Sequence, residues 1–452
     1  MNYQKRLLQA VPGGAHTYSR GYDQFPSNAP EILESGKGVH VFDPKGKKFL
    51  DYGMGLRAVN LGYAEDKIDE AAIKQIRNGT NLTRPSLIEL EAAELLIDLI
   101  DSVDMVKFTK NGSTAVSAAV KLARAFTGRD LVARCAEQPF FSYDDWFIGS
   151  TPLTKGIPQE TIEKTKTFKY NDIASLASLI DQYPGQIACV ILEPASTECP
   201  LPGTYDTKCC GLRNCVRQFN SEAENYLQQV QKLCEKHGIV FVLDEMITGF
   251  RWDMKGAQHH YGVTPDLCTF GKAMANGYAV ACVAGKREIM QLGSIEFEGQ
   301  ERVFLLSSTH GAEMASLGAF VATARFMQEN NTIEYLWDYG SKLMSMMNRK
   351  AYEHGISASF KVNGISCSPY YETLDSDGMN SLGLRTLFSQ EMIANGVLMP
   401  WISLAYRHTD ENFAFTERAL DAAFEIYERA IREGVEKYLV GSVIKPVFRK
   451  YN

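Results

Sequence analysis

The chain has 452 residues, of which 45% are hydrophobic and 22% are charged, and its formal net charge is -7. This composition is ordinary for a globular protein with a sizeable buried core, and the acidic balance argues against nucleic acid or an anionic membrane as a partner. No apolar run approaches the ~18 residues of a membrane span, and residues 1–14 lack the apolar segment of a signal peptide. We therefore expect a cytoplasmic protein.

The two ends of the chain predict a smaller domain. Residues 38–53 predict two short strands on either side of the turn sequence DPKG. Long helical patterns follow residue 315 at the other end. We expect the N-terminal segment 1–60 and the C-terminal part 311–452 to form one α+β domain together.

The middle of the chain alternates short apolar runs with helical patterns. Residues 104–108, 186–192 and 239–245 predict strands, and residues 114–128 and 223–238 predict helices that end on a glycine. Strands that are apolar on both faces and alternate with helices are typical of a mostly parallel central sheet with helices on both faces. We expect residues 61–310 to form this large α/β domain.

The sequence NGST, residues 111–114, lies between a predicted strand and a predicted helix. Gly112 allows another group to approach the backbone closely, and Ser113 and Thr114 can cap the helix and donate hydroxyl groups. A helix N-terminus also attracts an anion such as phosphate. Alone the signal is weak, because most turns of this kind are simple helix caps.

The stretch FVLDEMITGFRW ends an apolar strand on two carboxylates, Asp244 and Glu245. A buried carboxylate is costly unless a positive group meets it. The pyridine nitrogen of pyridoxal 5'-phosphate (PLP) is such a group, because a carboxylate keeps it protonated and the charged ring then accepts electrons. PLP also needs a lysine for its aldehyde, and Lys272 lies between an apolar run and a glycine-containing loop.

Each of these features has a simpler interpretation, since most lysines in loops are merely exposed. Their order is more informative: a phosphate turn, a strand that ends on aspartate and a lysine loop follow one another in one predicted parallel sheet. Ligands of such sheets bind beyond the carboxyl ends of the strands. This order predicts a PLP site.

The ten cysteines fall into two groups. Some, such as Cys189 and Cys282, lie in apolar runs and are expected in the core. Four others lie in a polar insertion at about residues 199–222 that has no C-x-x-C pair and no nearby histidine, namely Cys199, Cys209, Cys210 and Cys215. The spacing favours a surface loop over a zinc site, so we predict no metal.

The motif DEMITGFR followed by PDLCTFGKAMANG resembles the class III PLP-dependent aminotransferases, and most of all their glutamate-1-semialdehyde 2,1-aminomutase branch. The resemblance covers nearly the whole chain, through VPGGAHTYSR, VFDPKGKKFLDYGMG, NGSTAVSAAVKLARAFTGRD, VILEP, STHGAEMASLGA and GVLMPWISLAYRHTDENF. Only the cysteine-rich insertion has no recognised counterpart. The resemblance implies the PLP-dependent transferase fold type I.

The resemblance also implies roles for individual residues. Lys272 would bind the PLP aldehyde as a Schiff base and carry a proton, and Asp244 would pair with the ring nitrogen. The other implied cofactor contacts are Gly112 and Ser113 at the phosphate, Phe140 stacked on the ring, Met246 beneath it, Glu193 near its hydroxyl, and Thr309 at the phosphate of a neighbouring subunit. The last contact implies a homodimer with shared active sites.

Substrate choice is where the sequence departs from the aminomutase. The aminomutase has Ser-Trp-Gly where this chain has Gly55-Leu56-Arg57, and Tyr-His-Gly where it has Phe140-Phe141-Ser142. Arg20 matches a carboxylate-binding arginine, and Arg57 adds a second cation, for which a surface ion pair is the alternative interpretation. The other residues in stretches that the family places near the substrate are His310, Glu313, Arg407 and His408.

We predict an aminotransferase that takes an amino group from an amino acid, expected to be glutamate. The acceptor would be a carbonyl compound such as a sugar or sugar nucleotide of surface-polysaccharide biosynthesis. An aminomutase, a PLP racemase or epimerase, and a binding protein without catalysis are the alternatives. No G-x-G-x-x-G opens a βαβ unit, which argues against a nicotinamide enzyme.

Overall fold

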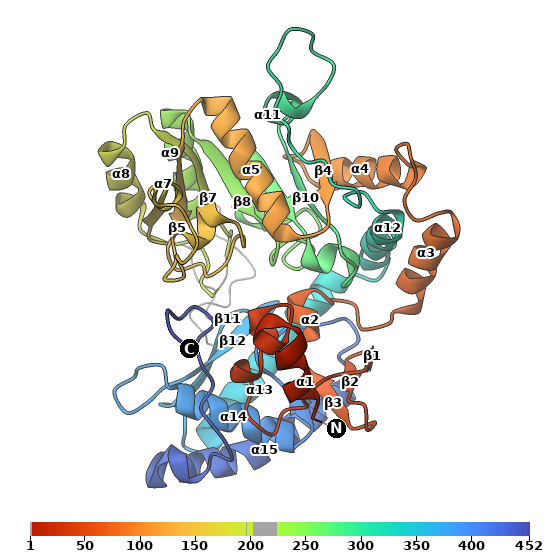
Figure 1. The fold of residues 1–452 in the computed structure, drawn as a ribbon. Coiled ribbons are helices and arrows are strands. Elements are labelled where there is room, and N and C mark those ends of the chain that lie inside the picture. The colour runs from red at the N-terminus through yellow and green to blue at the C-terminus, as the bar shows by residue number, and fades with distance from the viewer. Residues whose placement is uncertain (1, 196, 202–223) are drawn as a thin grey trace. The chain divides into compact units, whose positions relative to one another are not determined.

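The computed structural model describes residues 2–195, 197–201 and 224–452 (Figure 1). Cys209, Cys210 and Cys215, and with them most of the predicted insertion, lie outside the described residues. Within the described ranges no cluster of His, Cys, Asp or Glu side chains is placed to hold a metal ion, and no helix is long and apolar enough to cross a membrane.

The chain divides into two compact units. The small unit is built from both ends of the chain, Met1–Glu65 and Glu334–Asn452, and the large unit holds the described residues of the intervening segment to Ile333. Residues 311–333 thus belong with the large unit, because their helix packs against other helices of that unit. The domain boundaries predicted from the sequence stay a prediction.

The described part of the large unit contains a seven-stranded sheet with the order β4-β10-β9-β8-β7-β5-β6. All neighbouring strands are parallel except β10, which runs antiparallel to β4 and β9. The strands are β4 (Met105–Thr109), β5 (Leu131–Cys135), β6 (Thr165–Phe168), β7 (Ile187–Leu192), β8 (Val240–Asp244), β9 (Leu267–Phe270) and β10 (Ala281–Gly285). Every residue of β5, β7, β8, β9 and β10 is buried, which explains their near-continuous apolar sequences.

Helices cover both faces of this sheet, and the predicted α/β fold is confirmed. Helix α5 crosses β7, β9 and β10, and α12 packs against α3 and α4 (Figure 1). The helices are α3 (Asp66–Arg77), α4 (Leu87–Leu99), α5 (Gly112–Thr127), α6 (Asp145–Ile148), α7 (Gln159–Ile162), α8 (Ile173–Gln182), α9 (Tyr226–His237), α10 (Ala257–Tyr261), η4 (Lys272–Ala275), α11 (Arg287–Met290), η5 (Gln291–Gly293) and α12 (Met314–Glu329).

Local signals set the ends of two of these helices. Asn111 caps α5 and Asn225 caps α9 by accepting hydrogen bonds from backbone N–H groups. Gly128 and Gly238 end the same helices with φ of 66° and 61°, a left-handed conformation that glycine adopts without steric cost. The predicted C-terminal ends of both helices are therefore confirmed, whereas α5 begins at Gly112 and α9 at Tyr226, not at the predicted residues 114 and 223.

The described residues of the small unit form a four-stranded sheet and a hairpin, with strands β1 (Ser35–Lys37), β2 (His40–Phe42), β3 (Lys48–Asp51) and β13 (Val397–Leu398) in the sheet and β11 (Phe360–Ile365) and β12 (Ser368–Thr373) in the hairpin. The predicted strand pair within residues 38–53 is β2 and β3. The helices are α1 (Tyr3–Ala10), η1 (Pro12–Gly14), η2 (Tyr18–Arg20), η3 (Tyr22–Gln24), α2 (Met54–Arg57), α13 (Thr332–Glu353, from Glu334 on in this unit), α14 (Leu382–Ala394), α15 (Asp410–Glu433) and η6 (Val435–Lys437). Phe360, Phe388 and Phe424 pack among these elements in a buried aromatic core, with tilted and edge-to-face rings.

Candidate active site

The carboxyl ends of five strands meet at one edge of the large sheet. Strands β5, β7, β8 and β9 are parallel, and β4 has the same direction because both β4 and β9 are antiparallel to β10. Asp244 ends β8, Glu193 follows β7, Lys272 follows β9, and Gly112 and Ser113 follow β4. The sheet therefore gathers at one edge the residues that the sequence predicted for the cofactor.

Asp244 is buried at the end of the central strand β8. Its Oδ1 atom accepts hydrogen bonds from Met246 N at 3.0 Å and from Thr269 Oγ1 at 3.1 Å. Burial raises the pKa of Asp244 to about 6, and the positive charge of Lys272 opposes that rise. The carboxylate and the lysine are thus close enough to interact electrostatically, as a PLP site requires.

The neighbouring carboxylate, Glu245, has a different environment. It accepts hydrogen bonds from Ala257 N at 3.0 Å, from Gln258 N at 2.8 Å and from the Thr248 hydroxyl, and burial raises its pKa to about 7. These bonds fix the start of α10 to the end of β8. Glu245 therefore has a structural role, which differs from the cofactor-binding role predicted for Asp244.

Met246 packs between the turn at residues 111–114 and the loop that carries Lys272. A Cβ atom added to Gly112 would lie 2.8 Å from the Met246 sulfur, and one added to Gly271 would lie 2.6 Å from it. Met246 also packs with Ala115 and Ala281. Two glycines and two alanines thus make room for the thioether at the position where the resemblance puts the underside of the ring.

Lys272 begins the short helix η4 with φ of 44°, in the left-handed region that side chains other than glycine rarely adopt. Strained residues of this kind tend to occur at functional sites, where the surrounding structure holds them. Here the strand β9 on one side and the buried residues Ala273 and Met274 on the other fix the backbone.

The phosphate turn is tied to the loop that follows β5. Asn111 Oδ1 accepts hydrogen bonds from the N–H and the hydroxyl of Thr114 at 2.9 and 3.0 Å. Ser113 is buried, and its Oγ accepts a hydrogen bond from Tyr143 N at 3.1 Å, while Ser142 Oγ donates to Ser113 O at 3.3 Å. The turn therefore presents a fixed helix N-terminus to an anion.

The same loop carries Phe140 and contacts Glu193. The Phe140 ring is 46% exposed and rests against Phe147, with 5.8 Å between the ring centres. Gln138 is buried and binds the backbone of Glu193 twice, accepting from its N–H at 2.7 Å and donating to its carbonyl at 2.9 Å. No local pattern in the sequence marks Gln138 or Thr269 as a site residue, because their roles depend on partners far away in the chain.

The segment 309–313 of the large unit holds three predicted site residues, Thr309, His310 and Glu313. Thr309 and His310 are exposed, and the Thr309 carbonyl accepts a hydrogen bond from Asn81 Nδ2 at 3.0 Å. The predicted contact of Thr309 with a second subunit stays a prediction, as does a substrate role for His310.

Glu313 caps α12, and its predicted contact with the substrate stays a prediction. Its carboxylate accepts hydrogen bonds from Ala315 N and Ser316 N and forms an ion pair with Lys110 at 3.0 Å. Burial acts to raise the pKa of Glu313, but the hydrogen bonds from Ser316 and Lys110 outweigh it and hold that pKa below its usual value. Donors within the protein therefore bind the Glu313 carboxylate and compensate its charge.

The small unit holds the other predicted substrate residues. Arg407 makes a bidentate ion pair with Glu65, with both contacts at 2.8 Å. Arg57 Nη1 donates a hydrogen bond to Ser368 Oγ at 3.2 Å. Arg20 is exposed and makes no ion pair with the described residues. A carboxylate of the same unit therefore neutralises Arg407.

His408 is fully buried in the small unit, and its predicted contact with the substrate stays a prediction. Its ring stacks on Tyr52 with 4.6 Å between the ring centres, and Nδ1 accepts a hydrogen bond from Ala405 N at 3.0 Å. Burial lowers the pKa of His408 to about 3, so the ring is neutral at physiological pH. It has no exposed surface.

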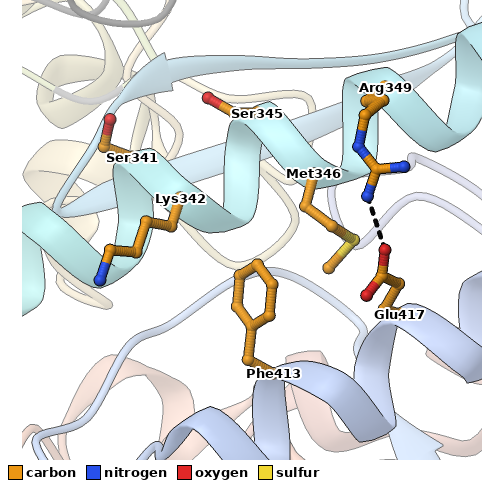
Figure 2. A pocket seen from close by; sticks show the side chains of 7 residues that line it. All are labelled: Ser341, Lys342, Ser345, Met346, Arg349, Phe413 and Glu417. Carbon is orange, nitrogen blue, oxygen red and sulfur yellow. Dashed lines mark hydrogen bonds and ion pairs between the residues drawn. The ribbon is translucent and has the colours of Figure 1, made fainter.

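A surface pocket of about 590 Å³ lies elsewhere in the small unit. Figure 2 shows side chains of α13 and α15 around it, with Arg349 and Glu417 joined by an ion pair of 2.5 Å. The lining residues are Ser341, Lys342, Ser345, Met346, Arg349, Phe413 and Glu417, and none is a predicted site residue. We therefore place the candidate site at the edge of the large sheet.

Comparison with known proteins identifies the family, because residues 18–431 match the model described as aminotransferase class-III. The chain belongs to the class III aminotransferase family. It is 31% identical over 430 residues to 3-aminobutyryl-CoA aminotransferase of Cloacimonas acidaminovorans (strain Evry), which covers 93% of this chain and 95% of that protein.

Solved structures share the fold of this aminotransferase. The FumI protein of Sphingopyxis sp. MTA144, solved with PLP, has a TM-score of 0.82 at 24% identity and covers 95% of this chain and 97% of its own. A glutamate-1-semialdehyde aminomutase from Pseudomonas aeruginosa PAO1 has a TM-score of 0.77 at 18% identity and covers 94% of each chain. These similarities confirm the PLP-dependent transferase fold type I.

The residues at the sheet edge fit PLP, which is the cofactor of this aminotransferase. The ring needs a negative group, which the buried carboxylate of Asp244 supplies, and the aldehyde needs an amine, which Lys272 supplies within electrostatic reach of that carboxylate. The phosphate needs a capped helix N-terminus, which α5 supplies, and Met246 lies so close to Gly112 and Gly271 that a Cβ atom on either glycine would collide with it. When bound, PLP supplies an electron-accepting ring that stabilises negative charge on the substrate carbon.

Asp244→Asn keeps the size of the side chain and removes its charge. We expect the variant to bind PLP, as judged by visible absorbance, while the rate at which an amino donor changes that absorbance falls on the order of 10³-fold. Glu245→Gln is the matched control, because it alters the adjacent structural carboxylate and should lower stability while the folded protein keeps its rate. Full activity of Asp244→Asn would contradict the role of Asp244.

His408 predicts a pH-dependent stability. Its pKa is about 3 in the folded protein and about 6.5 when unfolded, so only the unfolded chain binds the proton between these values and stability is lost as the pH falls through this window. The free energy of urea unfolding, taken relative to His408→Gln, should fall by about 2 kcal/mol from pH 7 to pH 5. A difference between the wild type and His408→Gln that stays constant from pH 7 to pH 5 would refute the buried neutral state.

Proposed function

We propose that this aminotransferase takes an amino group from glutamate and passes it to an anionic carbonyl compound, with a sugar phosphate or sugar nucleotide as the first candidate. The observation that carries the proposal is Arg20, an exposed arginine without an ion pair among the described residues. A guanidinium group suits a carboxylate or a phosphate because its N–H donors match both geometries. Arg57, in the same unit, supports the choice with a second cation.

We also propose the roles of the residues at the sheet edge. Lys272 would hold the cofactor aldehyde and move a proton at the substrate carbon that carries the amino group. Asp244 would keep the ring nitrogen protonated. The backbone of Gly112 and the side chain of Ser113 would hold the phosphate, and Phe140 would cover the ring opposite Met246.

An acyl-CoA thioester is the second candidate for the substrate. The relative from Cloacimonas acidaminovorans is named for 3-aminobutyryl-CoA, and it is similar to this chain over nearly its whole length. An acyl-CoA carries phosphate groups, so the same arginines would suit it. Arg407 contributes less to either candidate, because Glu65 already neutralises it.

We propose that the protein is a homodimer. Ile73 and Ile76 on α3 and Leu87 and Leu90 on α4 expose apolar side chains, and Thr309 is exposed in the same unit. Burying such side chains in a second copy would stabilise the assembly. Thr309 would then be available to the phosphate site of the partner.

The half-reaction tests the proposed function. Purified protein with PLP should change its visible absorbance on addition of glutamate and release 2-oxoglutarate, whereas glutamine, alanine and aspartate should react less. The converted enzyme should then return to its first spectrum with the true acceptor. If no amino acid reacts although PLP is bound, the transfer function is wrong, and isomerisation of candidate substrates by an aminomutase or epimerase is tested instead.

Light scattering after gel filtration tests the dimer. We expect a mass of twice the 50.4 kDa of one chain. A double variant, Ile76→Glu with Leu90→Glu, should shift the mass toward one chain, because charges in an apolar interface are costly. The exposed Phe126→Glu on α5 is the control. A monomeric wild-type protein would refute the proposal.

A further inference from the structure

Residues Met54–Arg57 form one turn of left-handed helix. Their φ angles are 41°, 59°, 65° and 65° in chain order. Hydrogen bonds from Arg57 N to Gly53 O at 3.2 Å and from Ala58 N to Met54 O at 3.1 Å close the turn. Residues other than glycine seldom adopt this conformation, and then as single residues. A turn that includes Met54, Leu56 and Arg57 therefore needs the surrounding structure to hold it.

A clamp formed by Asp51 and Tyr63 holds the start of this turn. Asp51 is buried at the end of β3, and its Oδ1 accepts a hydrogen bond from Gly53 N at 2.6 Å. Its Oδ2 accepts from Met54 N at 3.1 Å and from the Tyr63 hydroxyl at 2.6 Å. Trp401 Nε1 donates to Gly53 O at 3.0 Å from the other side. The turn is thus fixed at its first residues.

Arg57 is the last residue of the turn, so the backbone of the turn fixes the direction of its Cα–Cβ bond. The Arg57 guanidinium donates to Ser368 Oγ at 3.2 Å, at the beginning of β12. Arginine has five N–H donors in one plane, so one group can bind Ser368 and an acidic partner together. A surface ion pair, the simpler interpretation of Arg57, would not require a strained backbone beneath it.

Arg20 lies near this clamp. Burial and the Asp51 carboxylate raise the pKa of Tyr63, and the positive charge of Arg20 opposes that rise. The Arg20 guanidinium is therefore within electrostatic reach of Tyr63. Two arginines from distant positions in the chain thus converge on one structural feature of the small unit.

We propose that the Asp51–Tyr63 clamp positions Arg57, and that Arg57 selects an acidic group on the substrate. The proposal rests on the proposed function, because it names the residue that distinguishes an anionic acceptor from a neutral one. Asp51 and Tyr63 are positioning residues, since they act through the turn. Arg57 is the specificity-determining residue.

Isothermal titration calorimetry of the protein with PLP bound tests the proposal without turnover. The probes are succinate and inorganic phosphate, and neutral succinamide is the reference. In Arg57→Met we expect the affinity for at least one anion to fall about 10-fold or more, as for the loss of a charged hydrogen bond. In Tyr63→Phe we expect a smaller loss of about 3-fold, measured at a temperature at which the variant is folded, because one hydrogen bond to Asp51 is lost. The relative loss for the two anions distinguishes a carboxylate from a phosphate.

Arg432→Met is the matched control, because Arg432 lies on α15 in an exposed ion pair with Glu428. It should bind the probes like the wild type. Equal binding by Arg57→Met and the wild type, or no binding of either anion by the wild type, would overturn the role of Arg57. Unchanged binding in Tyr63→Phe would overturn the clamp. Glutamate that releases no 2-oxoglutarate would instead refute the proposed function, and the binding data would still decide the role of Arg57.

Discussion

The site depends on a negative charge kept at the end of a buried strand. Asp244 has almost no contact with water, and an isolated carboxylate in such a place would take up a proton. The lysine that follows the next strand opposes this, so burial raises the pKa of Asp244 only to about 6. Because β8 is held on both sides by β7 and β9, the carboxylate cannot turn toward solvent without disturbing the centre of the sheet.

Two adjacent residues show two ways of keeping a carboxylate inside a protein. Glu245 is satisfied by three donors of the protein itself, from Thr248, Ala257 and Gln258. Asp244 receives two hydrogen bonds, both on Oδ1, and a positive charge nearby. The first arrangement is closed and stabilises a loop, whereas the second suits a ligand that brings a positively charged N–H group.

The arginines of the small unit show why charge alone does not define a substrate site. Arg407 is held by a carboxylate 342 positions earlier in the chain, whereas Arg57 stands on a turn with unfavourable backbone angles. At about 1–2 kcal/mol for each residue other than glycine, that turn costs more than a surface ion pair returns. A protein that keeps such a turn has a reason other than the stability of the ion pair.

Patterns in the amino-acid sequence were enough to predict the fold class, the family and the pairing of Asp244 with Lys272. These follow from patterns local to the chain: apolar runs that mark buried strands, and polar residues placed directly after them, which a parallel sheet brings to one edge. Three features become visible only in the folded chain: Glu313 caps a helix beside Lys110, His408 lies inside the core, and Arg57 stands on a left-handed turn. Each of these depends on partners far away in the chain or on backbone angles set by packing, and neither leaves a periodic signal in the sequence.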